Sequence, residues 1–344
     1  MPASFKNPSI SIVIPTLNAA AVLRSCLKSI ISQHYPKKLI EIIIADGGST
    51  DDTIGLAKKF KCVIISNPLQ TGESGKAIGV KNAKGKYIAL IDSDNILPTS
   101  NWLKTMIKPL EINTKLIGSE PWKYTYRPSG GFIERYSALT GVNDPYALIS
   151  NIYDRKNYLR KSWTGLKLPI VNHRYYQIVT LKPNSLLPTI GANGTIFRST
   201  FLKPNIKSNY LIDVDIITAY LKQSKTPIYF AKIKTGIIHT FCESSIKKFY
   251  KKQLRRVTDL YVYKSMRIFP QKNTHLLGSL KFTLYVILIF PMLFDTLKGY
   301  LKKPDLAWFF HPLACWITLY TYSLGTIKSI LGILKPINRQ QWQQ

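Results

Sequence analysis

Two aspartates separated by a single residue follow an apolar segment of the chain. Asp92 and Asp94 come directly after residues 86–91 (KYIALI), which have the composition of a buried strand. Two carboxylates at this spacing can reach one hard cation, Mg²⁺ or Mn²⁺, together with a ribose. Such a metal would neutralise the phosphates of a departing nucleoside diphosphate. Because acidic turns are common, a solvated turn or a helix cap is the alternative interpretation.

Another carboxylate, Asp46, follows the strand-like residues 39–45 (LIEIIIA). It can accept a hydrogen bond from a nucleotide base, and the two glycines after it let a ligand approach the backbone. The structural alternative is a tight turn in which Ser49 or Asp51 caps a helix that begins at Thr53. Both interpretations can hold at once.

Acid–base chemistry has candidates later in the chain. Asp213 and Asp215 open a segment with helical spacing, LIDVDIITAYL. Acids in a first helical turn are favoured by the helix dipole, but a carboxylate near a metal can also deprotonate an acceptor hydroxyl. His239 follows the strand-like residues 235–238. It can contact a diphosphate or a metal, or it can be structural.

A glycine-rich segment, residues 71–77 (TGESGKA), matches a phosphate-binding loop only in part. Gln70 stands where the first glycine of that loop belongs, and Ala77 replaces the hydroxyl residue that would hold Mg²⁺. We therefore exclude an NTPase and keep Lys76 as a candidate phosphate contact.

The segments that must position these residues alternate between strand and helix. Strands are expected at residues 10–15, 39–45, 62–66 and 86–91, and helices at 19–32, 53–60 and 76–83. This alternation predicts an α/β fold with a mostly parallel sheet covered on both faces. Ligands bind such sheets at the carboxyl ends of the strands, where Thr16, Asp46 and Asp92 are expected. Residues 100–190 are less regular, and we interpret them as further strands and long loops.

Composition narrows the classes of function. The 344 residues include 48 Lys and Arg against 18 Asp and Glu, a formal charge of +30 that attracts nucleic acid, anionic lipid or phosphorylated substrates. A hydrophobic share of 45% excludes a disordered chain. The four cysteines are scattered and the N-terminus carries no apolar leader, so we expect reduced thiols in a cytosolic domain.

The last third of the chain predicts membrane attachment. Residues 246–256 (IKKFYKKQLRR) form a basic amphipathic stretch, as in helices that lie on a membrane surface. Residues 282–294 are apolar but too short to span a bilayer, whereas Leu306–Ile327 has 22 uncharged residues and is long enough. A pair of buried core helices is the alternative.

These observations predict a domain organisation. We expect a catalytic domain at 1–240, a basic interfacial segment at 241–275, membrane-associated helices at 276–335 and a polar tail at 336–344. The catalytic domain is expected to face the cytoplasm. Residues 122–127 (WKYTYR) can clamp a glycan or a polyprenyl phosphate, or can form an ordinary aromatic strand.

Four elements in this order resemble glycosyltransferase family 2, the inverting enzymes of GT-A fold. They are PTLN at 15–18, DGGSTDDT at 46–53, GKAIGVKNAKGKYIALIDSDN at 75–95, and GANGTIF at 191–197 with DVD at 213–215. The resemblance covers roughly residues 9–260. It implies a nucleotide-diphospho-sugar transferase fold and a hexosyltransferase that uses Mg²⁺ or Mn²⁺ and a UDP- or GDP-linked sugar.

The resemblance also implies roles for individual residues. The nucleotide pocket and donor surroundings would take in Pro15, Thr16, Asn18, Asp46, Gly48, Lys76, Asn82 and Ser93. Asp92 would contact ribose and metal, Asp94 would be the principal metal ligand, and His239 is a further candidate. Gly191, Ala192 and Asn193 would lie on the acceptor side of the donor sugar. The Glu-Asp pair of the family maps onto Ile212 and Asp213, which makes Asp213 the base, with Asp215 as a possible substitute.

A last comparison with the family concerns the acceptor. Processive members carry Gln-x-x-Arg-Trp, but here Gln253 and Arg256 are followed by Val257, which favours single additions. Arg256 is assigned to the donor pocket by this match. The C-terminal helices resemble those of members with lipid-linked or polyprenyl-phosphate acceptors in cell-surface glycan or glycoprotein synthesis. No nucleic-acid partner is expected; a basic membrane- or nucleic-acid-binding protein without catalysis is the alternative.

Overall fold

The computed structural model describes residues 7–160, 162–191, 193–267 and 275–339. Its contacts divide the chain into two units. The first consists of Met1–Pro121, Leu168–Ser185 and Ile190–Ile238, and the second of Trp122–Lys167, Leu186–Thr189 and His239–Gln344. This division differs from the boundary expected at residue 240, because residues 122–167 group with the C-terminal part of the chain.

The first unit is built on a ten-stranded sheet with the order β3-β2-β1-β4-β9-β6-β10-β8-β7, in which β5 pairs with β10. The strands are β1 (Ile10–Thr16), β2 (Ile40–Asp46), β3 (Val63–Ser66), β4 (Tyr87–Leu90), β5 (Asn95–Ile96), β6 (Leu116–Tyr124), β7 (Ile170–Asn172), β8 (Tyr176–Leu181), β9 (Thr195–Arg198) and β10 (Ile228–His239). Strands β1 to β4 pair in parallel, whereas β9 pairs antiparallel with both β4 and β6. The expected α/β class is therefore confirmed, but a mostly parallel sheet holds only for β1 to β4, because β9 and the β10-β8-β7 strands pair antiparallel.

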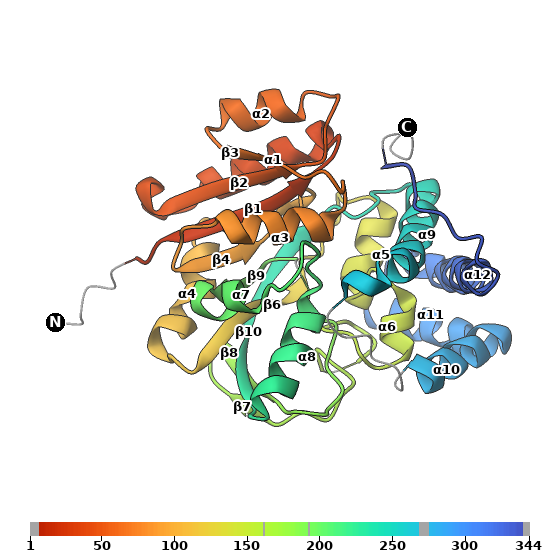
Figure 1. Cartoon of the computed structure of the whole chain (residues 1–344). Helices are drawn as coiled ribbons and strands as arrows, with labels where there is room; N and C mark the ends of the chain where they lie inside the picture. The colour runs from red at the N-terminus through yellow and green to blue at the C-terminus, as the bar shows by residue number, and fades with distance from the viewer. Residues whose placement is uncertain (1–6, 161, 192, 268–274, 340–344) are drawn as a thin grey trace. The chain divides into compact units, whose positions relative to one another are not determined.

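Helices cover both faces of this sheet. They are α1 (Ala20–Ile31), α2 (Thr53–Lys59), α3 (Gly72–Asn82), α4 (Trp102–Ile112), α7 (Ser199–Asn205) and α8 (Asp213–Ser224), with a short 3₁₀ helix η1 (Lys37–Leu39). Right-handed crossovers from β1 to β2 and β3 place α1 and α2 on one face. The chain then returns to β4 beside β1, so α3 lies on the opposite face, in front of the strands in Figure 1. The loops that follow β1, β2 and β4 therefore lie together at the carboxyl ends of these parallel strands.

Two expectations from the sequence need correction here. Helix α3 begins at Gly72 rather than at Lys76, because the Thr71 hydroxyl accepts the Ser74 N–H at 3.0 Å and caps the helix. Residues 100–190 contain the helices α4, α5 (Phe132–Thr140) and α6 (Pro145–Ile149) as well as strands. The strands expected in this region are present, but its helices were missed: Pro109 inside α4 concealed its period, and the Asp-Pro start of α6 is a helix signal.

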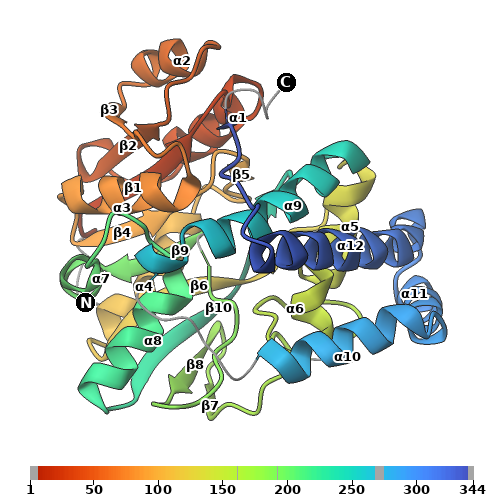
Figure 2. The same cartoon turned by 45° about the vertical axis from the view of Figure 1, so that its right-hand side comes forward.

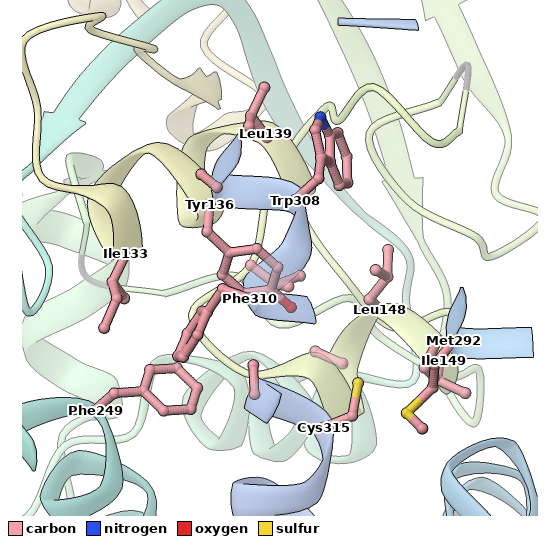
Figure 3. Close-up of a cluster of buried hydrophobic side chains, with 14 of the residues drawn as sticks. Ile133, Tyr136, Leu139, Leu148, Ile149, Phe249, Met292, Trp308, Phe310 and Cys315 are labelled. Carbon is pink, nitrogen blue, oxygen red and sulfur yellow. The ribbon is translucent and has the colours of Figure 1, made fainter. Parts of the chain in front are cut away.

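The second unit is helical and has its own core. Besides α5 and α6 it contains α9 (Ile246–Val262), α10 (His275–Ile287), α11 (Phe290–Lys302) and α12 (His311–Ile330), with the 3₁₀ helices η2 (Lys264–Met266) and η3 (Leu306–Phe310). Figure 3 shows its buried cluster, in which Phe310 packs edge-to-face on Tyr136 and Phe249 with ring centroids 5.2 and 5.1 Å apart. Burial of these rings, and of Trp308 beside them, stabilises the unit without help from a sheet.

Helices α9 and α12 lie side by side in the second unit (Figure 2). A Cβ added at Gly325 of α12 would stand 2.7 Å from a methyl of Val257 in α9, so the contact depends on this glycine. The stretch expected to lie on a membrane surface, 246–256, is thus only the first part of a longer helix. That helix buries Phe249 and Gln253 inside the unit.

The long apolar segments take a different form from the one expected. Within the ranges described, none of the helices is by itself long and apolar enough to cross a bilayer. The segments Leu276–Ile287 and Phe290–Lys302 reach that length and composition only as a pair, and they are bent by 82° where they meet. Residues 282–294 are broken at Ile289, which has a φ of +59°. The run Leu306–Ile327 is divided between η3 and α12 and is apolar partly because it supplies Trp308, Phe310 and Cys315 to the core.

Candidate active site

The loops after β1 and β2 are held together by Asp46. Thr16 and Asp46 end the two strands and stand opposite each other in register. Asp46 Oδ1 accepts the Thr16 hydroxyl at 2.8 Å and the Ser49 hydroxyl at 2.5 Å, and Oδ2 accepts the N–H groups of Gly48 and Ser49 at 2.9 and 2.8 Å. A carboxylate has about four acceptor positions, and these contacts use that number. Asp46 therefore shapes the loop, and its contact with a nucleotide base stays a prediction.

The predicted pocket residues beside Asp46 fix the same loops. Asn18 Oδ1 accepts the Thr50 N–H at 2.8 Å, and the Asn18 N–H donates to the Ser49 hydroxyl at 2.8 Å. Gly48 has a φ of +88°, a conformation that glycine adopts without strain. A Cβ at Gly75 of α3 would meet Pro15 Cβ at 2.8 Å, so the helix packs tightly on the end of β1.

Asp92, Ser93 and Asp94 form a turn just beyond β4. Asn95 closes this turn, because its Oδ1 accepts the Asp92 N–H at 3.0 Å and its own N–H donates to the Asp92 carbonyl at 2.9 Å. All three turn residues are half-buried, and carboxylate oxygens of Asp92 and Asp94 lie within 4.8 Å of each other. Two hard oxygen ligands at this separation suit Mg²⁺ or Mn²⁺.

A lysine from α3 contacts this acidic turn. Lys76 is 9% exposed, and its Nζ lies 3.6 Å from Asp92 Oδ1. The other predicted residue of α3, Asn82, is exposed and ends the helix, about 9 Å further along its axis. Because α3 runs back from the carboxyl ends of the strands, the structure brings Lys76 to the site and does not bring Asn82 there.

Asp213, the predicted base, is the first residue of α8 and is 8% exposed. Its Oδ1 has no hydrogen-bond partner among the described residues. Burial, opposed by the Lys76 charge and assisted by the Asp92 charge, raises the pKa of this carboxyl to about 7. A carboxyl that titrates near neutral pH beside a carboxylate pair has the properties of a general base. Asp215 is also buried and lies within the first turn of the same helix.

The segment before β9 is held by a hydrogen bond to one partner of a buried ion pair. Gly191 donates its N–H to Glu120 Oε1 at 3.3 Å, and Lys232 Nζ lies 2.5 Å from Glu120 Oε2. Both charged side chains are fully buried. Asn193 Oδ1 accepts from Asn95 Nδ2 at 3.1 Å, which ties this segment to the acidic turn. The predicted site residue Ala192 lies outside the described residues.

Sequence reasoning missed Glu120, Lys232 and Asn95, which support the predicted residues without replacing any of them. Asn95 had a signal, because an Asn placed three residues after Asp92 fits a turn of this kind. The partners of the ion pair are 112 residues apart, and each is a single charge within an otherwise ordinary strand. Nothing local in the sequence pairs them.

Residues 11–167 match the family model described as Glycosyl transferase family 2. This segment is similar to that family. Glycosyltransferase AglE of Haloferax volcanii is 28% identical over 142 residues, which are 39% of this chain and 46% of that protein. The UDP-Glc:alpha-D-GlcNAc-diphosphoundecaprenol beta-1,3-glucosyltransferase WfaP of Escherichia coli is 34% identical over 137 residues, 39% of this chain and 50% of that protein. The chain thus aligns with about half the length of these relatives.

A solved structure extends the likeness beyond residues 11–167. The mannosyltransferase PcManGT from Pyrobaculum calidifontis, in complex with GDP-Man and Mn²⁺, has a TM-score of 0.52 at 12% identity. The match covers 95% of this chain and 88% of that one. At this identity the likeness concerns the fold, and it supports the GT-A fold that the motifs implied.

Two predicted site residues, His239 and Arg256, lie after the matched residues 11–167 and in the second unit. His239 ends β10, is 6% exposed, and has its Nδ1 3.2 Å from Asn143 Nδ2. Arg256 Nη1 lies 2.6 Å from Gln253 Oε1 and 3.5 Å from Asp144 Oδ2. These contacts hold both side chains within the second unit, and their assignment to metal and donor stays a prediction.

Proposed function

We propose that this chain transfers a sugar from a UDP- or GDP-linked donor to an acceptor hydroxyl, using a divalent metal held by Asp92 and Asp94. The observation that carries the proposal is the buried Asp213 carboxyl, whose pKa is raised to about 7, at the same strand ends as the two aspartates. If Asp92 and Asp94 formed only a solvated turn, a buried carboxyl nearby with an oxygen that lacks a partner among the described residues would be unexplained.

The proposed reaction is a single displacement with inversion. The Asp213 carboxylate takes the proton from the acceptor hydroxyl as the oxygen of that hydroxyl forms a bond to the anomeric carbon. The bond from the anomeric carbon to the diphosphate breaks, and its electron pair stays on the nucleoside diphosphate. Lys76, 3.6 Å from Asp92, is placed to donate to the departing phosphate oxygens.

The metal would be Mg²⁺ or Mn²⁺, because both prefer oxygen ligands of the kind that Asp92 and Asp94 supply. When bound, it stabilises the negative charge that develops on the leaving diphosphate. We propose His239 as a third ligand. Its support is the continuity of the sheet: β10 ends at His239 and pairs with β5, which begins one residue after Asp94. The Pyrobaculum calidifontis structure is a complex with Mn²⁺, which fits this choice of metal.

The acceptor is proposed to be lipid-linked, in cell-surface glycan or glycoprotein synthesis. The name of the Escherichia coli relative includes a diphosphoundecaprenol acceptor, and this supports the class of acceptor. Single additions rather than processive synthesis are proposed because Val257 stands where processive family members carry Trp. Val257 is buried and packs against Gly325.

Membrane attachment, with the catalytic domain facing the cytoplasm, remains part of the proposal. It is supported by apolar side chains on α10 and α11 that are each more than two fifths exposed: Leu276, Leu277, Leu280, Leu284, Ile287, Phe290, Leu293, Phe294, Leu297 and Leu301. A soluble surface rarely carries this many in sequence. The bend between the two helices fits a pair that enters one leaflet and leaves by the same side.

The test is nucleotide binding by the full chain purified in detergent. UDP and GDP are titrated with and without Mn²⁺, for the wild type and for Asp94→Asn. Binding of one diphosphate that requires Mn²⁺ and is lost in the variant is the expected result. Absence of metal-dependent binding of either nucleotide would overturn the proposal, and the interpretation as a basic membrane- or nucleic-acid-binding protein would then be preferred.

A further inference from the structure

A cavity of about 420 Å³ within the second unit gathers positive charge. It lies among the end of β6, α5, residues 156–160 and the last residue of α11. Four of its lining side chains are cations: Lys123, Lys156, Arg160 and Lys302. Among the described residues that line it there is no carboxylate. A cluster of like charges is unfavourable in the absence of a counter-charge, so the cavity has the composition of an anion site.

The cations are held in place by their neighbours. Lys302 Nζ donates to the Leu159 carbonyl at 3.2 Å, and the Lys156 ammonium lies 5.7 Å from the centre of the Trp122 ring. Arg160 Nη2 lies 3.6 Å from Asp295 Oδ2. Of these three contacts, only the last brings a negative charge. A ligand with more than one negative charge is therefore needed to balance the cavity.

An unsatisfied donor lines the same cavity. Asn157 is 4% exposed, and its Oδ1 accepts the Arg160 N–H at 2.8 Å, whereas its Nδ2 lacks a well-formed hydrogen bond to any residue that the structure describes. A buried N–H without an acceptor is costly, and a phosphate oxygen in the cavity would satisfy it.

The remaining walls of the cavity and the helix beside it are apolar. Tyr124, Tyr126 and Tyr158 supply aromatic surface. Along α11, an apolar stripe of exposed side chains recurs at helical spacing and ends one residue before Lys302. The stripe consists of Phe290, Leu293, Phe294, Leu297 and Leu301. A ligand whose anionic head fills the cavity would thus have hydrocarbon-binding surface next to that head.

We propose that this cavity binds the diphosphate of an isoprenoid diphosphate, with the hydrocarbon chain along the α11 stripe. The four cations, one of them shared with Asp295, suit the two or more charges of a diphosphate better than the single charge of a phospholipid phosphodiester. The assignment of this ligand as the acceptor of sugar transfer rests on the proposed function. Its binding in the cavity does not depend on that function.

The experiment measures binding of farnesyl diphosphate, farnesol and inorganic diphosphate to the full chain. Two variants remove the site in different ways. Lys156→Gln with Lys302→Gln deletes two of the cations, and Asn157→Asp keeps the acceptor for the Arg160 N–H while placing a negative charge in the cavity. Lys335→Gln is the matched control, since this exposed lysine lies beyond α12 and does not line the cavity. Thermal unfolding of each variant verifies that the fold is retained.

We expect farnesyl diphosphate to bind at least tenfold more tightly than either farnesol or inorganic diphosphate. Both cavity variants should weaken it tenfold or more, and Lys335→Gln by less than twofold. Equal binding by a cavity variant and the wild type, or equal binding of farnesol and farnesyl diphosphate, overturns the proposal. The proposal is also overturned if the cavity variants lose binding to phosphatidylglycerol vesicles but still bind farnesyl diphosphate, because the cavity would then bind a phospholipid. Failure of Mn²⁺-dependent nucleotide binding in the wild type would contradict the proposed function alone.

Discussion

The two units of this chain concentrate opposite charges. In the first, Asp92, Asp94 and Asp213 collect at the strand ends with a single lysine, Lys76. In the second, a cavity is lined by four cations. The proposals assign a diphosphate to each, but by different physics: the acidic site needs a metal ion between protein and ligand, whereas the basic cavity contacts its ligand directly. A formal charge of +30 therefore describes neither site.

The largest effect should come from removing the metal ligand of the acidic site. Asp94→Asn is expected to lower sugar transfer roughly 1,000-fold, because stabilisation of the leaving group is lost. Turnover of the donor measured with saturating Mn²⁺ tests this. Asp52→Asn is the matched control, since Asp52 is an exposed acid before α2 that makes no side-chain cap bond. An equal loss of turnover in both variants would mean that the activity depends on the overall negative charge of the region and not on a metal held by Asp94.

A second substitution separates chemistry from binding at the same site. Asp213→Asn should lower turnover roughly 100- to 10,000-fold, as expected for loss of a general base, while leaving Mn²⁺-dependent nucleotide binding unchanged. The activity of the wild type should rise as the pH approaches about 7, because the Asp213 carboxyl ionises there. If nucleotide binding falls together with turnover, Asp213 belongs to the donor pocket. If Asp215→Asn alone abolishes turnover, the base is Asp215.

The buried ion pair beneath the acidic site should be costly to break. Glu120→Gln leaves the Lys232 charge unpaired in a fully buried position, and a loss of roughly 3–5 kcal/mol in the free energy of unfolding is expected. Denaturant titration provides the measurement. The double variant Glu120→Met with Lys232→Met should lose less than Glu120→Gln, because it buries no unpaired charge. A greater loss in the double variant would show that Glu120 acts mainly through Gly191.

The acidic site should also trade stability for function. The folded-state pKa of Asp213, about 7, lies above its ordinary 3.8, so the folded chain binds more protons between these values and loses stability as the pH rises through them. Asp213→Asn removes that loss. We expect the variant to be more stable than the wild type at pH 8, by up to about 4 kcal/mol, and equally stable at pH 4. Thermal unfolding in EDTA at the two pH values tests the sign.

The smallest effect concerns basic residues outside the cavity. Lys247 and Lys248 are exposed at the start of α9, and each should contribute roughly 1 kcal/mol to binding of anionic vesicles. Lys247→Gln and Lys248→Gln are compared by vesicle flotation at low and high salt. Farnesyl diphosphate binding should not change in either variant. A change there would remove the distinction between the basic cavity and the general basic surface.

Much of the first unit was predictable because its signals are local. Short apolar strands, each followed by a polar residue, placed Asp46 and Asp92 correctly at the ends of β2 and after β4. Helical spacing placed Asp213 at the start of α8. Lys76 was predicted as a phosphate contact, and the structure places it beside Asp92. The roles of these residues stay predictions, although their positions are those that the roles require.

The second unit was not predictable in the same way. Its core joins Tyr136, Phe249 and Phe310, which are far apart in the chain and carry no shared motif. The uncharged run Leu306–Ile327 has two physical explanations, lipid and protein core, and composition does not separate them. The basic cavity likewise draws on residues 123, 156, 160 and 302, so only the folded chain brings its charges together.

The packing of Val257 on Gly325 limits how this chain can evolve. A tryptophan at 257, as in processive members of the family, would require space that the neighbouring helix occupies, because even a methyl group at 325 would collide with the present valine. The change would have to be accompanied by a shift of α12 or by substitutions along its length. Val257→Trp alone is thus expected to destabilise the second unit, and the substitution would be tolerated only together with changes in α12.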